Sequence, residues 1–298
     1  MKYESDIITV AVVNFKLKAG KKEQNVSRIL DFSRSAAKRG ADMIVFPEMC
    51  TVGYDFFVDE SIPRKEKEDI SEPIDGPTCK RIVEVAKQNE IYIVVGMAEK
   101  DKDTGELYNI AFVAGPEGAI GAYRKIHPWD FENSWCKKGD TPFMFDTKWG
   151  PISVGICYDT YHFPELMRHY ANQGSRLYLN PTAILEDYTT TSNSKGSKNY
   201  YALTLEYGAL TNGIFVASAN LAGRDNFSYF GGGSCIIGPK IQNGAEIEVA
   251  YYAGDVDNVQ AGMFLETLDL SLATRGIFKD NKYVGAPDYR PEVYKKFL

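Results

Sequence analysis

Two hydrophobic periods alternate along the chain. Residues 7–13 form a continuous apolar run, which is the pattern of a strand covered on both faces of a sheet. Residues 21–39 instead place Val26, Ile29 and Leu30 at three- and four-residue steps, which predicts an amphipathic helix that ends before Gly40. A second apolar run at 43–46 predicts the next strand, so the chain begins with a strand–helix–strand unit.

The same alternation continues to the C-terminal part of the chain. Further helices are predicted at 77–90, 163–173 and 200–212. Further strands are predicted at 91–96, 107–114, 119–126, 152–156, 176–179, 214–219, 234–237, 246–252 and 263–270. The charged segment 54–77 and the Ser/Thr-rich segment 186–199 are predicted as surface connections.

The sequence contains signals for both parallel and antiparallel pairing of strands. Strand–helix–strand units favour parallel pairing, whereas the turn sequence at 115–118 favours a hairpin between two neighbouring strands. The simplest packing is an α/β fold of two mixed sheets face to face with helices outside, a four-layer αββα sandwich. A single doubly wound sheet is the alternative. No composition break divides the chain, so residues 1–298 are expected to form one domain with a C-terminal tail at about 285–298.

Charge and cysteine content narrow the class of protein. The net charge of −6 argues against a nucleic-acid partner, which would select a basic face. No apolar run is long enough for a membrane span, so no membrane association is expected. The five cysteines are scattered and include no C-x-x-C pair, which indicates neither a disulfide framework nor a zinc site. A reducing, cytoplasmic location is therefore expected.

Three chemically reactive residues lie at or just beyond the ends of predicted strands. Glu48 follows strand 43–46, Lys125 lies near the end of strand 119–126, and Cys157 follows strand 152–156. Each alone has an ordinary structural explanation, but ligands of α/β sheets bind beyond the strand ends. Together a thiol, a carboxylate and an ammonium group provide a nucleophile, a base and a positive charge for an oxyanion.

These residues occur in sequence blocks that resemble those of the nitrilase superfamily, the carbon–nitrogen hydrolases with a Glu-Lys-Cys triad. The three catalytic blocks are Phe46-Pro47-Glu48, Tyr123-Arg124-Lys125 and Gly155-Ile156-Cys157-Tyr158-Asp159. Further similar blocks are Phe163-Pro164-Glu165-Leu166, Ala219-Asn220, Phe230-Gly231-Gly232-Gly233-Ser234 and Arg290-Pro291-Glu292-Val293-Tyr294. The resemblance covers nearly the whole chain, and three blocks in the right order are more specific than any one of them.

The resemblance implies an αββα sandwich, a homodimer and a hydrolase that acts through an acyl-enzyme. It assigns Cys157 as the nucleophile and Glu48 as the general base, with Lys125 and the backbone N–H of Tyr158 holding the oxyanion. It requires no metal and no organic cofactor. The three histidines show no metal-ligand spacing either.

The resemblance also implies a second acidic residue after the lysine block. Glu132 fits that position and would orient Lys125 or the substrate amine. Asp130 is the alternative, because the length of this connection varies within the family.

Substrate choice is narrowed but not decided. True nitrilases have the sequence Cys-Trp-Glu at the nucleophile, whereas this chain has Cys157-Tyr158-Asp159. By this resemblance, small amides or N-carbamoyl amines are favoured as substrates over nitriles. Aromatic residues near the blocks form either core packing or a pocket. We hypothesise that Tyr54, Trp129 and Trp135 line the acyl pocket, with Tyr158 as a further substrate contact. The substrate candidates are ω-amides of dicarboxylates, aliphatic amides and N-carbamoyl amines.

Two other functions compete with this interpretation. A Cys-His hydrolase of the glutamine amidotransferase kind would require Gly where Asp159 stands, and a histidine beyond His169, the last one in the chain. A catalytically inactive subunit that only binds partners is disfavoured because all three triad residues are present.

Overall fold

Two six-stranded sheets form the centre of the protein. The computed structural model describes residues 3–185, 200–239, 247–253 and 261–296. The strand order of the first sheet is β14 (Gly262–Asp269), β1 (Ile7–Asn14), β2 (Met43–Val45), β3 (Tyr92–Lys100), β4 (Leu107–Gly115), β5 (Gly118–Arg124). The strand order of the second sheet is β13 (Ile247–Ala253), β12 (Ser234–Pro239), β9 (Phe215–Asn220), β8 (Leu177–Thr182), β7 (Ile152–Val154), β6 (Phe143–Phe145).

Both sheets have a parallel centre and antiparallel edges. Strands β1, β2 and β3 pair in parallel, as do β7, β8 and β9, whereas β14, β4, β5, β6, β12 and β13 pair antiparallel to their neighbours. The parallel pairs are joined by helices and the β4–β5 pair by a short turn, as the two kinds of sequence signal predict.

The side chains of β1 show how the layers are built. Val10 and Val12 point into a core between the sheets, which they share with Leu179 of β8 and Ala217 of β9. The alternate residues of β1, among them Val13, belong to a second core beneath the helices. A strand buried on both faces needs such a continuous apolar run, which is the pattern of residues 7–13.

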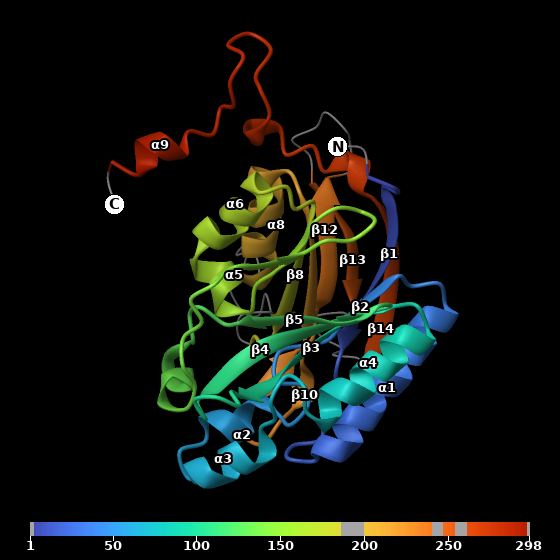
Figure 1. Ribbon diagram of the computed structural model, residues 1–298, viewed down its shortest axis with the longest axis vertical. Helices are drawn as coiled ribbons and strands as arrows, with labels where there is room; N and C mark the ends of the chain where they lie inside the picture. The colour runs from blue at the N-terminus through green and yellow to red at the C-terminus, as the bar shows by residue number, and fades with distance from the viewer. Residues whose placement is uncertain (1–2, 186–199, 240–246, 254–260, 297–298) are drawn as a thin grey trace, which may run out of the picture.

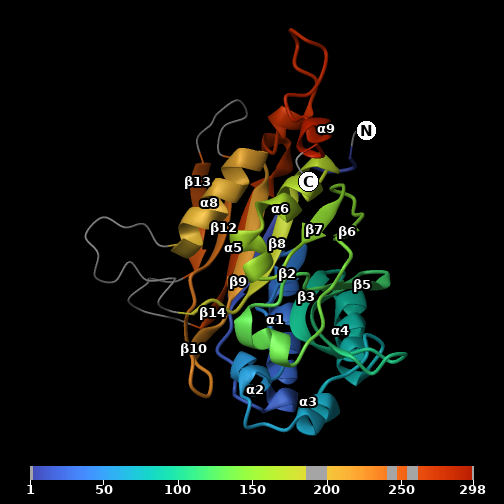
Figure 2. The ribbon, with the colours of Figure 1, turned by 90° about the vertical axis from the view of Figure 1, so that its left-hand side faces the viewer.

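Helices cover the outer faces of both sheets. The helices α1 (Lys22–Lys38) and α4 (Pro77–Gln88) lie on one side of the molecule, and α5 (Tyr158–His162), α6 (Pro164–Asn172) and α8 (Tyr200–Asn212) lie on the other (Figures 1 and 2). The predicted four-layer αββα sandwich is therefore confirmed, and the single doubly wound sheet is wrong.

Several short elements differ from the sequence prediction. The segment 54–77 contains two short helices, α2 (Tyr54–Val58) and α3 (Arg64–Ile70), where an irregular connection was expected. The predicted helix 163–173 is preceded by the separate turn of helix α5. Strands β6, β10 (Ala222–Arg224) and β11 (Tyr229–Gly231), each of three residues, were not predicted because they are too short to show a period. The predicted connection 186–199 lies outside the described residues.

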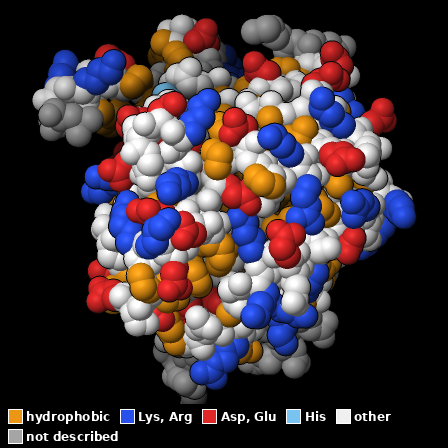
Figure 3. All heavy atoms as spheres, turned by 60° about the horizontal axis from the view of Figure 1, so that its bottom comes forward, with side chains coloured by type: hydrophobic (Ala, Val, Ile, Leu, Met, Phe, Trp, Pro, Cys, Tyr) orange, Lys and Arg blue, Asp and Glu red, His pale blue; other side chains and the backbone are white. Residues whose placement is uncertain are grey.

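The C-terminal segment extends away from the sandwich. Three 3₁₀ helices occur in the described chain: η1 (Asp130–Ser134), η2 (Leu270–Leu272) and η3 (Gly276–Phe278). After η3 the chain projects from one end of the molecule and carries the short helix α9 (Pro291–Tyr294), as Figure 1 shows. Basic and acidic side chains are interspersed over the face drawn in Figure 3. Among the described helices, none has the length and apolar character that a membrane crossing requires.

Candidate active site

Glu48 lies three residues after the end of β2 and is completely buried. The neighbouring strand β3 has Gly96 at this point, and a side chain there would collide with the backbone of Pro47 and Glu48. Glu48 Oε1 accepts hydrogen bonds from Lys125 Nζ and Asn109 Nδ2, each at 2.7 Å, and Oε2 accepts one from the Ala183 amide at 2.9 Å. The carboxylate is therefore held by groups from both sheets.

Lys125 follows β5 and is almost completely buried. Its Nζ donates to Oε1 of Glu48 and to Oε1 of Glu132, both at 2.7 Å. Burial alone would lower the pKa of Lys125, but the two carboxylates outweigh burial and hold that pKa well above its ordinary value. Lys125 is thus a fixed positive charge.

Glu132, and not Asp130, is the second acidic residue of this cluster. The turn of η1 buries Glu132 completely, while Asp130 is exposed. Glu132 Oε1 also accepts a hydrogen bond of 2.7 Å from the Tyr54 hydroxyl. Burial raises the pKa of Glu132 to about 7, with Lys125 opposing and Glu48 reinforcing that shift.

Cys157 occupies a sharp turn between β7 and α5. Its backbone has φ +47° and ψ −106°, a conformation that non-glycine residues adopt only under constraint. The Cys157 amide donates to Asn180 Oδ1 (3.0 Å) and to the Pro181 carbonyl (3.1 Å) on the adjacent strand β8. Burial, together with the charge of Glu48, raises the pKa of the Cys157 thiol, so the sulfur is protonated at neutral pH.

A buried carboxylate ties this turn to the lysine block. Asp159 Oδ1 lies 2.9 Å from the backbone nitrogen and 2.8 Å from Nδ1 of His127, and Oδ2 accepts a 2.8 Å hydrogen bond from the Tyr123 hydroxyl. His127 in turn stacks on Phe163, with ring centroids 3.5 Å apart. These contacts couple the position of Lys125 to that of Cys157.

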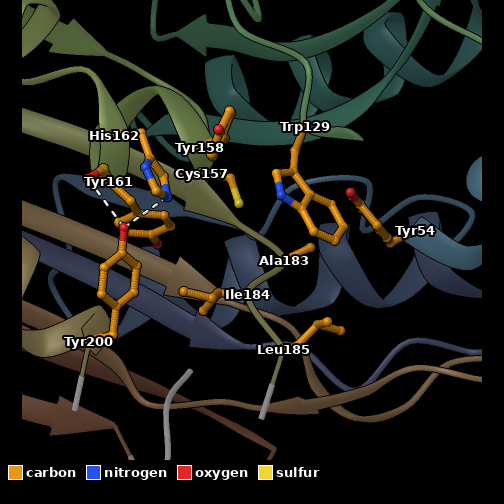
Figure 4. Close-up of a pocket in the computed structure, with 10 residues that line it drawn as sticks. All are labelled: Tyr54, Trp129, Cys157, Tyr158, Tyr161, His162, Ala183, Ile184, Leu185 and Tyr200. Atoms are coloured by element: carbon orange, nitrogen blue, oxygen red, sulfur yellow. Dashed lines mark hydrogen bonds between the residues drawn. The ribbon is translucent and has the colours of Figure 1, made fainter. Parts of the chain in front are cut away.

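A cavity of about 360 Å³ opens beside the cysteine. The view in Figure 4 shows the sulfur of Cys157 directed into the space between Trp129, Tyr158 and Ile184. The lining residues are Tyr54, Trp129, Cys157, Tyr158, Tyr161, His162, Ala183, Ile184, Leu185 and Tyr200. Tyr54, Trp129 and Tyr158 are thus among the lining residues, and their contact with substrate stays a prediction.

Trp135 does not line this cavity, contrary to the hypothesis. It is buried in the core beneath α2, where its ring packs 4.6 Å from that of Phe57. The turn of η1 directs Glu132 toward Lys125, and the indole that follows three residues later packs against α2.

Sequence reasoning missed several residues of the site. Asn109 on β4 donates to Glu48 (2.7 Å) and Glu132 (3.4 Å), and Thr182 on β8 bonds to the Cys157 thiol. The only sequence signal for Asn109 is a single amide side chain within an otherwise apolar strand. The amide of Ala183 could not have been found, because a backbone group leaves no trace in the sequence.

Comparisons with known proteins identify the family of this chain. Residues 9–250 match the model of the family described as carbon-nitrogen hydrolase. The chain belongs to this family. The prediction of a carbon–nitrogen hydrolase of the nitrilase superfamily is therefore confirmed.

Relatives of this carbon–nitrogen hydrolase are found among named enzymes. It is 32% identical over 238 residues to a nitrilase of Pyrococcus abyssi, covering 79% of this chain and 83% of that protein. It is 32% identical over 249 residues to the human omega-amidase NIT2, covering 79% of this chain and 84% of the relative.

Solved structures of similar fold include an amidase and a further family member. An amidase from Nesterenkonia sp. gives a TM-score of 0.74 at 21% identity, covering 98% of this chain and 96% of that one. Nit3 of Saccharomyces cerevisiae gives 0.74 at 21% identity, covering 90% and 92%. In one structure of the Nesterenkonia amidase, a mutant form, the acetamide moiety of fluoroacetamide is covalently added at the active-site cysteine.

Proposed function

We propose that this carbon–nitrogen hydrolase cleaves the C–N bond of a small amide through a thioester on Cys157. The observation that carries the proposal is the convergence of Glu48 and Lys125, joined at 2.7 Å, beneath a cavity into which the Cys157 sulfur points (Figure 4). N-carbamoyl amines are the second substrate class with the same reacting group.

The first half-reaction forms the acyl-enzyme. Glu48 takes the proton of the Cys157 thiol as the sulfur bonds to the amide carbon, because the raised pKa of this thiol leaves it protonated beforehand. The carbonyl oxygen becomes an oxyanion held by Lys125 and the Tyr158 amide, the first N–H of α5, which has no partner within the helix. Glu48 then passes its proton to the nitrogen as the C–N bond breaks, and ammonia or an amine leaves.

The second half-reaction releases the acid. Glu48 takes a proton from water as the water oxygen bonds to the thioester carbon. The C–S bond breaks, the carboxylic acid product leaves, and the proton returns from Glu48 to the sulfur. Glu132 and Tyr54 keep Lys125 in place throughout, because the Glu132 carboxylate bonds to both.

A Cys157→Ala protein tests this scheme directly. We expect it to release ammonia from amides at least about 10³-fold more slowly than the wild type, because the covalent route is lost. Ammonia release would be screened over ω-amides of dicarboxylates, aliphatic amides and N-carbamoyl amines. Mass spectrometry of the wild type with a slow substrate would detect the acyl adduct. Full activity of Cys157→Ala would refute the proposal.

The Cys-His alternative is tested by the same screen. His162 lines the cavity, but its Nε2 lies 2.9 Å from the hydroxyl of Tyr200, which places that nitrogen in a polar pair on the wall. We therefore assign the base to Glu48. A Glu48→Gln enzyme with wild-type activity would favour the histidine instead, and a wild type without any amide hydrolysis would favour the inactive binding subunit.

The expected homodimer and location are also proposals. Helix α8 exposes Leu203, Tyr207 and Leu210, which is support for a second copy of this chain against the α6–α8 side. Sedimentation of the wild type and of Tyr207→Glu would test that interface. The five cysteines, all unpaired in the structure, favour a reducing compartment such as the cytoplasm.

A further inference from the structure

The described residues that line the cavity beside Cys157 carry almost no charge. Apart from Cys157 and His162, its described lining consists of Tyr, Trp, Ala, Ile and Leu residues, without a Lys, Arg, Asp or Glu side chain. Ala183, Ile184 and Leu185 form one side of it, and Tyr200 and Trp129 lie on other sides (Figure 4). Such a wall binds an apolar group by excluding water.

Lys125, a buried cation beneath Cys157, is not free to bind a carboxylate of the substrate. Lys125 already donates to Glu48 and Glu132, and its remaining donor faces the developing oxyanion in the proposed reaction. Glu48 and Glu132 add negative charge beneath the cysteine, which repels an anionic substrate. A carboxylate on the acyl chain would therefore be buried without a partner in the described part of the cavity, at a large cost.

We propose that this enzyme selects neutral amides with an apolar acyl group and discriminates against ω-amides of dicarboxylates. The inference rests on the proposed amide hydrolysis and names its substrate class. This substrate preference differs from the activity that the name omega-amidase gives to relatives of this chain. At 32% identity, the residues of the pocket wall can differ between this chain and the human omega-amidase NIT2. Each methylene added to an acyl chain that the cavity accommodates raises kcat/KM roughly fourfold.

Among the described lining residues, His162 is the one whose side chain can carry a positive charge. Its Nε2 lies 2.9 Å from the Tyr200 hydroxyl, and that hydroxyl also donates to the Tyr161 carbonyl at 3.4 Å. A positively charged imidazole would attract a carboxylate, so the substrate comparison is made at several pH values. Substrate ratios in Tyr200→Phe would show whether the pair has any part in selection.

The decisive experiment compares amides of matched shape on the wild-type enzyme. Succinamate carries a carboxylate where 4-methylpentanamide carries an isopropyl group, and succinamide is the neutral polar control. We expect kcat/KM for 4-methylpentanamide to exceed that for succinamate at least about 100-fold, with succinamide between them. Equal or faster hydrolysis of succinamate overturns the inference while leaving amide hydrolysis intact. Failure to hydrolyse any amide overturns the proposed function itself.

A lysine introduced on the cavity wall tests whether the lack of a cation there causes the discrimination against anionic substrates. Leu185 is partly buried on the cavity wall, so Leu185→Lys adds a positive charge there, and Leu185→Met is its uncharged control of similar length. We expect the succinamate to 4-methylpentanamide ratio of kcat/KM to rise at least about tenfold in Leu185→Lys and to stay within about threefold in Leu185→Met. An unchanged ratio in a folded Leu185→Lys enzyme would contradict the missing cation as the cause.

Discussion

The buried charges beneath Cys157 form one unit. Two carboxylates share a single ammonium group, so each member depends on the other two. Glu48 and Glu132 are fully buried, and the Lys125 side chain is enclosed between them. Breaking such a group by removing one partner leaves an uncompensated charge, which is much more costly than an exposed ion pair.

Lys125→Met should therefore reduce both stability and activity. We expect the free energy of unfolding to fall by about 3–5 kcal/mol, because two carboxylates lose their cation, and kcat to fall at least about 10²-fold. The double variant Lys125→Met/Glu132→Gln removes one of the stranded charges and should recover stability without activity. Denaturant unfolding and ammonia release measure the two effects, and recovery of activity would contradict the role given to Lys125.

The raised pKa of Glu132 predicts an acidic limb in the pH profile of kcat/KM. Above about pH 7 the Glu132 carboxylate is charged and holds the Lys125 ammonium group through a 2.7 Å contact. When Glu132 takes up a proton, this ion pair is lost and Lys125 is held less firmly where the oxyanion forms, so kcat/KM should fall as the pH drops through about 7. Glu132→Gln, which is permanently neutral, should lose this limb. Persistence of the same limb in that variant would assign it to another group.

At the scale of elements, two buried acids join α2 to the turn between β10 and β11. Asp225 Oδ2 accepts the Asp55 amide at 2.9 Å, and Asp55 Oδ2 accepts the amides of Phe227 and Ser228 at 2.7 Å. The Oδ1 atom of each acid is buried without a hydrogen-bond partner among the residues that the structure describes. Burial raises the pKa of Asp225 to about 6, and the nearby Asp55 carboxylate adds to the shift.

Asp225 should make stability fall with rising pH. Its pKa is higher in the folded than in the unfolded chain, so the native state retains the proton longer. The stabilisation is complete below about pH 4 and is lost as the pH rises through about 6. Relative to Asp225→Asn, the wild type should lose on the order of 2–3 kcal/mol across this window. Urea unfolding at several pH values measures the difference, and a pH-independent difference would contradict the shifted pKa.

At the scale of the whole molecule, the two sheets share one core. Val10 and Val12 of the first sheet lie in the same cluster as Leu179 and Ala217 of the second. Neither sheet has a complete apolar interior without the other. The site has the same property, since Glu48 and Lys125 come from one sheet and Cys157 and Ala183 from the other.

The shared core predicts one cooperative unfolding transition, as expected for a single domain. Far-ultraviolet circular dichroism, tryptophan fluorescence and amide hydrolysis should all be lost at the same denaturant concentration. Two separated transitions would show that the halves of the sandwich, or the C-terminal segment, unfold independently.

Most of the longer elements of this protein could be predicted from its sequence. The sequence predicts α8 at its observed bounds, although the apolar residues of that helix are not confined to one face, and apolar runs predict most of the longer strands. The positions of Glu48, Lys125 and Cys157 at strand ends, with the blocks around them, are enough to indicate the family.

Only the tertiary structure decided what those residues meet. Whether Glu132 or Asp130 faces Lys125 depends on how η1 turns, and Trp135 packs against α2 for the same reason. Asn109 reaches Glu48 from β4, which is distant in sequence. The nearly uncharged described wall of the cavity is assembled from α2, α5, α8 and the segments that follow β5 and β8. The hydrophobic periodicity of the sequence indicates whether a residue is buried. Which residues it then contacts is decided only when the two sheets pack together.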